Sequence, residues 1–118
     1  MRTLSVKLIF ALLVLGAASV APLSGTTTNA QEKSFIGYIS DSHCGLKHMK
    51  GMGDDKSCTL MCVKGGSKFV LADRGHRRVY RLDQSGQDKA RDFAGQKVKV
   101  TGRVSGKTIR VTAIEAAT

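Results

Sequence analysis

The sequence predicts a mainly β domain in which five short strands are accompanied by two short helices. Three observations support this fold class. Short segments of alternating or β-branched residues recur from residue 35 onward. Gly-rich and polar turns separate these segments, and two stretches of helical character interrupt them. All three cysteines, and every methionine except the initiator, lie within residues 41–66, which is therefore where we expect any chemical site.

Residues 1–30 have the layout of a secretory signal peptide. A positively charged start precedes an apolar run at residues 8–21, and small polar residues follow it up to Ala30. The run has about 14 residues, fewer than the roughly 20 that a transmembrane helix needs. We therefore expect cleavage after Ala30, with residues 31–118 forming one exported domain. The domain would be periplasmic or extracellular, with no stable membrane span after cleavage.

The first strand is expected at residues 35–40, where aromatic and β-branched residues are bounded by polar ones. A loop rich in Gly, Lys and His follows it. A short helix is then expected at residues 56–64. Asp54 or Asp55 can cap its start, and Gly65-Gly66 mark its end.

A hairpin and a second helical segment are expected next. Strands at residues 68–73 and 77–82 flank a tight turn at Arg74-Gly75-His76. The second strand alternates between apolar and polar residues, so one of its faces is expected to be solvated. Residues 84–93 form a polar segment of helical character.

The last two strands are expected at residues 96–104 and 107–114, with Ser105-Gly106 as a two-residue hairpin turn. Five short strands with a helix between the third and the fourth have the connectivity of an OB-fold, a partly open Greek-key barrel, and the helix after the first strand is an extra one. We therefore predict a five-stranded OB-fold-like barrel. A short cysteine-bearing helix follows strand 1, and a second short helix lies between strands 3 and 4.

Several motifs resemble a known family. They are Gly-Tyr-Ile-Ser-Asp-Ser-His-Cys-Gly at residues 37–45, Cys58-x3-Cys62-Val63, and Phe-Ala-Gly-Gln-Lys-Val at residues 93–98. These motifs resemble an uncharacterised family of small exported bacterial domains of OB-fold type with a three-cysteine first connection. More loosely, the chain is similar to periplasmic OB-fold domains linked to stress tolerance. The resemblance implies the fold and the export, and it carries over no catalytic residue.

The cysteine-rich segment is compatible with binding of a soft metal ion. The spacing Cys-x3-His followed by Cys-x3-Cys offers three thiolates and one imidazole, a donor set that suits tetrahedral zinc. Thioether sulfur nearby shifts the set toward Cu(I), so copper and zinc both remain candidates. The candidate ligands are Cys44, His48, Cys58 and Cys62, with His43, Met49 and Met52 as second choices.

The same sulfurs are also compatible with a disulfide or with thiol chemistry. A bridge from Cys44 to Cys58 or Cys62 closes a ring of about 15 to 19 residues and contributes about 3 kcal/mol. A bridge between Cys58 and Cys62 is disfavoured, because two Cα atoms on one helix face lie near the limit of disulfide reach. Cys58 would lie in the first helical turn, where the helix dipole lowers a thiol pKa. No Cys-x2-Cys pair supports a redox role.

The basic composition suggests a second class of function. Loss of the leader removes two basic residues and lowers the formal net charge from +10 to +8. A small domain with this charge binds polyanions, and export favours an anionic component of the cell envelope over nucleic acid. The candidate anion-binding residues are Arg74, Arg77, Arg78, Arg81 and Lys68. Because the sequence contains neither a credible catalytic triad nor a nucleotide-binding turn, we expect no catalysis.

Overall fold

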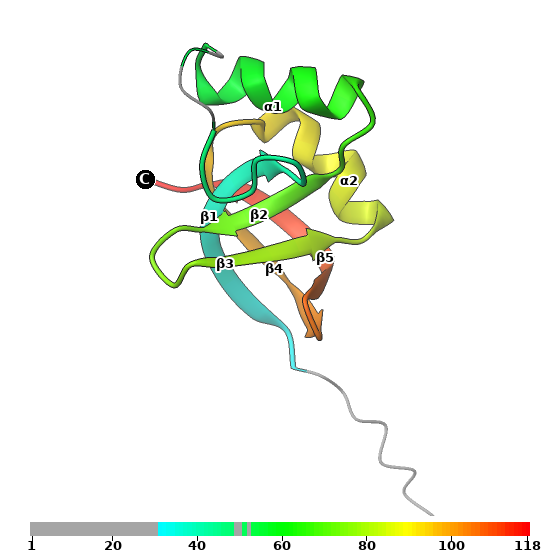
Figure 1. The fold of residues 1–118 in the computed structure, drawn as a ribbon. Coiled ribbons are helices and arrows are strands. Elements are labelled where there is room, and N and C mark those ends of the chain that lie inside the picture. The colour runs from blue at the N-terminus through cyan, green and yellow to red at the C-terminus, as the bar shows by residue number, and fades with distance from the viewer. Residues whose placement is uncertain (1–30, 49–50, 52) are drawn as a thin grey trace, which may run out of the picture.

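The computed structural model describes residues 31–48, 51 and 53–118. Its elements are β1 (Lys33–Asp41), α1 (Asp55–Lys64), β2 (Phe69–Asp73), β3 (Arg78–Leu82), α2 (Gln84–Ala90), the 3₁₀-helix η1 (Arg91–Phe93), β4 (Lys97–Ser105) and β5 (Thr108–Ala116). Within the described residues the fold is mainly β, and five strands form one mixed sheet that closes in a ring (Figure 1). No helix in these ranges is long and apolar enough to span a membrane.

The sheet closes because β1 pairs with a strand on each side. Its first part pairs with β4 and its last part with β2, both antiparallel, so that Tyr38 lies opposite both Lys97 and Ala72. The ring is completed by an antiparallel β4–β5 hairpin and a parallel β3–β5 pair. Gly37 precedes the point at which β1 changes partner, and a Cβ atom there would lie 2.7 Å from the carbonyl oxygen of Ala72. Glycine therefore permits the close approach of β1 and β2.

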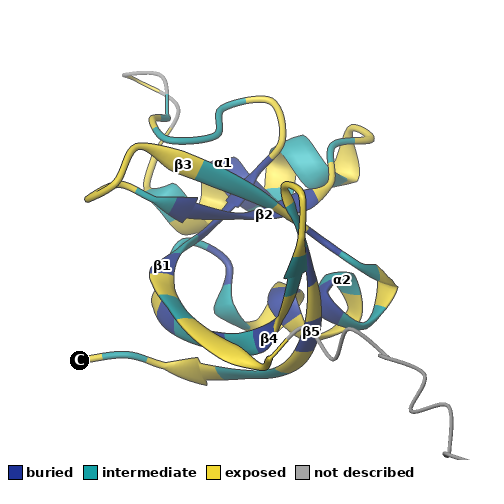
Figure 2. Cartoon of the chain, turned by 90° about the horizontal axis from the view of Figure 1, so that it is seen from below, coloured by how far each residue is buried: buried dark blue, intermediate teal, exposed yellow. Residues whose placement is uncertain are grey.

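The hydrophobic core fills the inside of the ring. On β4 buried side chains recur at every second position, as at Val98 and Val100, because successive residues of a strand face opposite sides of the sheet, whereas on β2 the four residues 69–72 are all buried. Figure 2 shows buried and exposed residues alternating along β4 and β5, and β2 buried over most of its length. The core members are Ile39, Phe69, Leu71, Leu82, Ala90, Ala94, Val98, Val100, Ile109 and Val111.

The elements follow the sequence-based expectations in order, with differences at their bounds: β1 begins two residues earlier than expected, and β3 begins one residue later because Arg77 belongs to the turn. Asp54 caps α1 by accepting the N–H of Ser57 at 2.7 Å, as expected from the sequence. The helical segment at residues 84–93 is split into α2 and η1. The last hairpin turns at Gly106-Lys107, one residue later than expected, because Ser105 is paired with Thr108. Gly106 has φ +59°, which suits the first central position of a type II′ turn.

The β2–β3 turn contains a carboxylate with a depressed pKa. Asp73 Oδ1 accepts the backbone N–H of His76 at 3.1 Å, and Oδ2 lies 2.7 Å from Nδ1 of the same histidine. Burial raises the pKa of Asp73. The two bonds from His76, together with the charges of His76 and Arg78, outweigh burial and hold the pKa below its ordinary value of 3.8. Such a group stabilises the fold above that value, and the contribution is lost as the pH falls through the folded-state pKa.

Replacing Asp73 with Asn is therefore expected to lower the free energy of unfolding by about 1 kcal/mol at neutral pH. The difference should shrink toward about pH 2, because the carboxyl group takes up a proton as the pH falls through the depressed folded-state pKa. Urea unfolding of both proteins at the two pH values measures this effect. Asp92→Asn, an exposed substitution in η1, is the matched control. An equal loss for Asp73→Asn at both pH values would contradict the assignment.

Candidate functional site

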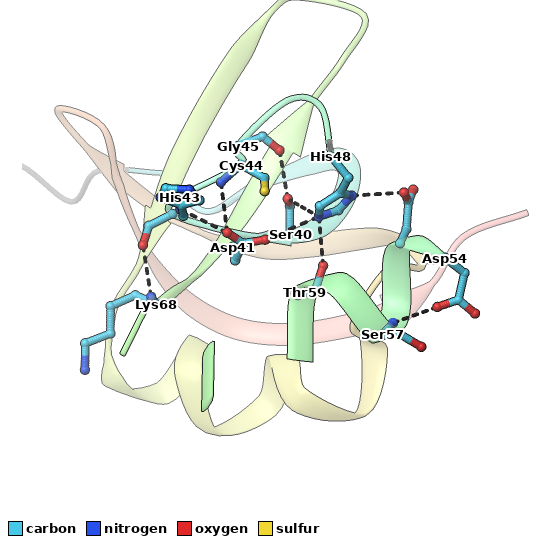
Figure 3. Close-up of polar contacts among 12 residues, drawn as sticks. Ser40, Asp41, His43, Cys44, Gly45, His48, Asp54, Ser57, Thr59 and Lys68 are labelled. Atoms are coloured by element: carbon cyan, nitrogen blue, oxygen red, sulfur yellow. Dashed lines mark hydrogen bonds and ion pairs between the residues drawn. The ribbon is translucent and has the colours of Figure 1, made fainter. Parts of the chain in front are cut away.

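Asp41, the last residue of β1, organises the loop that follows it. Its side chain is fully buried. Oδ1 accepts the backbone N–H groups of His43, at 3.0 Å, and of Cys44, at 2.9 Å. The hydroxyl of Ser40 donates to the carbonyl oxygen of Gly45 at 2.7 Å (Figure 3). These bonds turn the chain back immediately after the strand and fix the position of Cys44.

His48 lies between this loop and α1, and its side chain is only 7% exposed (Figure 3). Its Nδ1 atom is 2.9 Å from Oδ1 of Asp55. Its Nε2 atom is 3.1 Å from Oγ1 of Thr59 and 3.3 Å from Oδ2 of Asp41. Partners from β1 and from α1 therefore fix the orientation of the imidazole.

The three cysteines meet beside this histidine. One ligand atom each from Cys44, His48 and Cys58 lie within 4.8 Å of one another, and the same holds for Asp41, Cys44 and Cys62. Because Cys44 belongs to both groups, the three sulfur atoms and the imidazole form a single cluster. We call Cys44, His48, Cys58 and Cys62 the cysteine–histidine cluster. All three cysteines are free thiols in this structure, so the predicted disulfide stays a prediction.

The surroundings raise the pKa values of the two helix thiols. Burial raises the pKa of Cys58, and the neighbouring Cys44 adds to the effect. Burial also raises the pKa of Cys62 to about 11, with a further contribution from the charge of Asp41. The sequence predicted a lowered pKa at Cys58. The direction is the opposite, because loss of hydration at a buried thiol outweighs the helix dipole.

Asp55 links the cluster to the β2–β3 turn. Its second carboxylate oxygen, Oδ2, accepts a bond from Nη2 of Arg74 at 3.0 Å. This bond, and to a smaller extent the bond with His48, holds the pKa of Asp55 below its ordinary value in spite of burial. An anionic oxygen facing Nδ1 requires a proton on that nitrogen. Nε2 faces the other side of the site, where Thr59 and the carboxylate of Asp41 lie within 3.3 Å.

A glycine allows α1 to approach the sheet closely. Gly95 lies between η1 and β4, has φ +75°, and donates its N–H to the carbonyl oxygen of Ile39 at 2.8 Å. A Cβ atom at this position would lie 2.4 Å from the backbone nitrogen of Lys56. The chain at Gly95 therefore packs directly against the first turn of α1, the turn that leads to Cys58.

The second-choice ligands do not join the cluster in the described residues. His43 is exposed and lies on the Lys68 side of the loop, away from His48 (Figure 3). Met49 and Met52 lie outside the described residues.

Asp55 and Thr59 are parts of the site that the motifs in the sequence did not indicate. Together with Cys58 and Cys62 they occupy positions i, i+3, i+4 and i+7 of α1. This spacing places all four on one helix face, and it is the signal that could have revealed them.

The five candidate anion-binding residues are divided among three pockets. Arg74 and Arg77 line a pocket beside the cysteine–histidine cluster. Arg74 also lines a groove along β1 and β3 that includes Arg78. Arg81 and Lys68 line a separate depression near the start of β2. Arg74 is thus shared by two neighbouring pockets, whereas Arg81 and Lys68 line a different one.

Comparison with known proteins gives one match. Residues 62–117 match the family model described as Protein of unknown function (DUF5818). This match fits the expectation of an uncharacterised domain family. It covers the scaffold from β2 to β5, but of the cysteine–histidine cluster it includes only Cys62. No curated protein and no solved structure matches the chain.

Proposed function

We propose that this protein is an exported domain of OB type that binds one soft metal ion, zinc or copper, at the cysteine–histidine cluster. One observation carries the proposal. The ligand atom of Cys44 lies within 4.8 Å of those of His48, Cys58 and Cys62. Donor atoms around a tetrahedral zinc ion lie roughly 3.5–3.8 Å apart, so the donors of Cys44, His48 and Cys58 need to approach one another by only about 1 Å, and Cys62 would complete the set from its place beside Cys44.

The environment of His48 supports the proposal. A metal-bound histidine usually donates its second ring N–H to a carboxylate, which fixes the tautomer and the orientation of the ring. Asp55 occupies this position at 2.9 Å from Nδ1, and Arg74 in turn holds Asp55. This pairing at Nδ1 supports coordination through Nε2, which would then give up its present contacts with Thr59 and Asp41.

The donor set explains why both metals remain candidates. Three thiolates with one imidazole complete a closed tetrahedral zinc site, and thiolates also select Cu(I). Binding of either ion replaces the thiol protons with the metal. The bound ion would tie the loop after β1 to α1, as the predicted disulfide would do by covalent linkage.

Metal analysis tests this function directly. Protein purified without oxygen is expected to contain one zinc or copper ion per chain. His48→Gln should weaken the affinity by at least about tenfold, since it removes one ligand. His43→Gln changes a histidine of the same loop that lies outside the cluster, so it should leave the affinity unchanged. A metal-free protein with one disulfide and one alkylated thiol, as found by mass spectrometry, would refute the metal proposal.

A second candidate function is binding of an anionic cell-envelope polymer, and one groove favours it. This groove has a volume of about 560 Å³ and is lined by Phe35, Tyr38 and Tyr80 together with Arg78 and Lys97. The ring centroids of Phe35 and Tyr80 are 5.2 Å apart. Aromatic faces beside basic groups suit a charged polymer that contains rings. Such binding should weaken steeply as the salt concentration rises, and Tyr80→Ala should reduce it.

A further inference from the structure

A pocket of about 860 Å³ opens beside the cysteine–histidine cluster. It lies between the loop after β1 and the β2–β3 turn, which are on the same side of the molecule in Figures 1 and 2. A pocket of this size accommodates a small organic molecule. The residues that line it are Cys44, Leu46, Lys47, His48, Asp55, Arg74 and Arg77.

The lining of this pocket carries more positive than negative charge. Lys47, Arg74 and Arg77 are cations, and Asp55 is the one acidic residue among the lining residues. Asp55 is already paired with Arg74 and with His48, at 3.0 and 2.9 Å. It therefore does not neutralise Lys47 or Arg77, both of which are exposed. This excess of positive charge favours an anionic ligand.

The backbone of Arg77 is a second, independent observation. Arg77 has φ +54°, and among the described residues it is the only one other than glycine with a positive φ. It is the last residue of the turn between the paired residues Asp73 and Arg78. Glycine or asparagine is the usual residue in this conformation, and arginine there costs conformational free energy. Turn formation therefore does not account for this arginine, whereas a role for its guanidinium at the pocket does.

We propose that this pocket binds a small organic oxyanion, a carboxylate or a phosphate ester. Its charged group would lie among Lys47, Arg74 and Arg77, because guanidinium groups bind the oxygens of such anions in a bidentate manner. The apolar side chain of Leu46 would contact the remainder of the ligand, next to Cys44. The proposal does not depend on the metal ion, since Lys47, Arg74 and Arg77 are not members of the cysteine–histidine cluster.

Titrations followed by NMR test this site. Metal-free protein, prepared with an immobilised chelator, is titrated with inorganic phosphate and, separately, with citrate at constant ionic strength. Saturable shifts are expected in the amides of residues 44–48 and 74–77 for at least one of the two anions. The anion that binds more tightly identifies the ligand as a phosphate or a carboxylate.

Variants then separate specific binding from general attraction to a basic protein. Arg77→Gly should weaken the binding about tenfold, because it removes a charge-assisted hydrogen-bond donor. The same substitution should leave thermal stability unchanged or raise it, because glycine suits a positive φ. Arg103→Gln removes an equal charge from an exposed position on β4 and should leave the binding unchanged. Lys47→Gln removes a pocket cation from the loop after β1, and it is the second pocket variant beside Arg77→Gly in the β2–β3 turn.

Two outcomes would overturn the proposal. One is the absence of saturable shifts with either anion, or shifts spread evenly over the basic surface. The other is an equal loss of affinity in Arg77→Gly and Arg103→Gln. Because the titrations use metal-free protein, their failure would leave the metal proposal intact, and failure of metal binding would leave this one intact.

Discussion

Replacing Cys44 with Ser is expected to weaken metal binding by about a hundredfold or more. The estimate follows from the affinity of four-ligand zinc sites, about 10–16 kcal/mol, of which one ligand contributes roughly 3 kcal/mol. Cys44 is the residue most sensitive to substitution, because it belongs to both groups of ligand atoms that lie within 4.8 Å. It is only half-buried, so the fold should survive the change.

Competition with a chromophoric chelator measures this effect. Cys62→Ser is the matched comparison, since it also removes one thiol. Cys62 belongs to only one of the two sets of neighbouring ligand atoms, the set with Cys44 and Asp41. The loss for Cys62→Ser should be smaller than the loss for Cys44→Ser. Circular dichroism and urea unfolding of both variants establish that they are folded. A folded Cys44→Ser protein with wild-type affinity would show that the sulfur atoms do not share an ion.

Replacing Gly95 with Ala destabilises the protein by about 3 kcal/mol and displaces the first turn of α1. Part of the cost is the positive φ of +75°, which alanine disfavours by roughly 1–2 kcal/mol. The rest arises because the new Cβ atom would lie 2.4 Å from the backbone nitrogen of Lys56. Overpacking against backbone costs about 1–3 kcal/mol, and no rotation of a side chain relieves it. Urea unfolding and the metal affinity are both expected to show the damage.

Gly106→Ala is the control that separates the two contributions. Gly106 has φ +59°, and no atom of the described residues lies within 4 Å of a Cβ atom placed there. This variant should therefore lose only the stability that the positive φ costs alanine. Its metal affinity should remain that of the wild type. If both variants lose the same stability and both keep the metal, then contact between Gly95 and α1 does not position the site.

Much of the fold could be predicted from the sequence, because its signals are local. Alternating residues such as Val98 and Val100 indicate strands, and Asp54 and Gly65 mark the two ends of α1. The hairpin turn at Ser105-Gly106 was misplaced by one residue, because the register of a hairpin depends on both strands and not on the turn residues alone. The candidate ligands Cys44, His48, Cys58 and Cys62 could also be proposed, from residue type and spacing.

Only the tertiary structure decided which of these residues meet. It brought His48 and not His43 to the cysteines, because Asp41, Asp55 and Thr59 hold one imidazole while the other stays exposed. It reversed the expected direction of the pKa shift at Cys58, because burial is set by packing and not by position along a helix.

The tertiary structure also distributed the basic residues among separate pockets. By itself, the sequence determined the order of the elements and the chemical character of their faces. Which faces meet depends on how β1 bends to pair with both β2 and β4, and on how closely Gly95 lets α1 approach. These are contacts between residues distant in the chain, and the local pattern of residues contains no information about them.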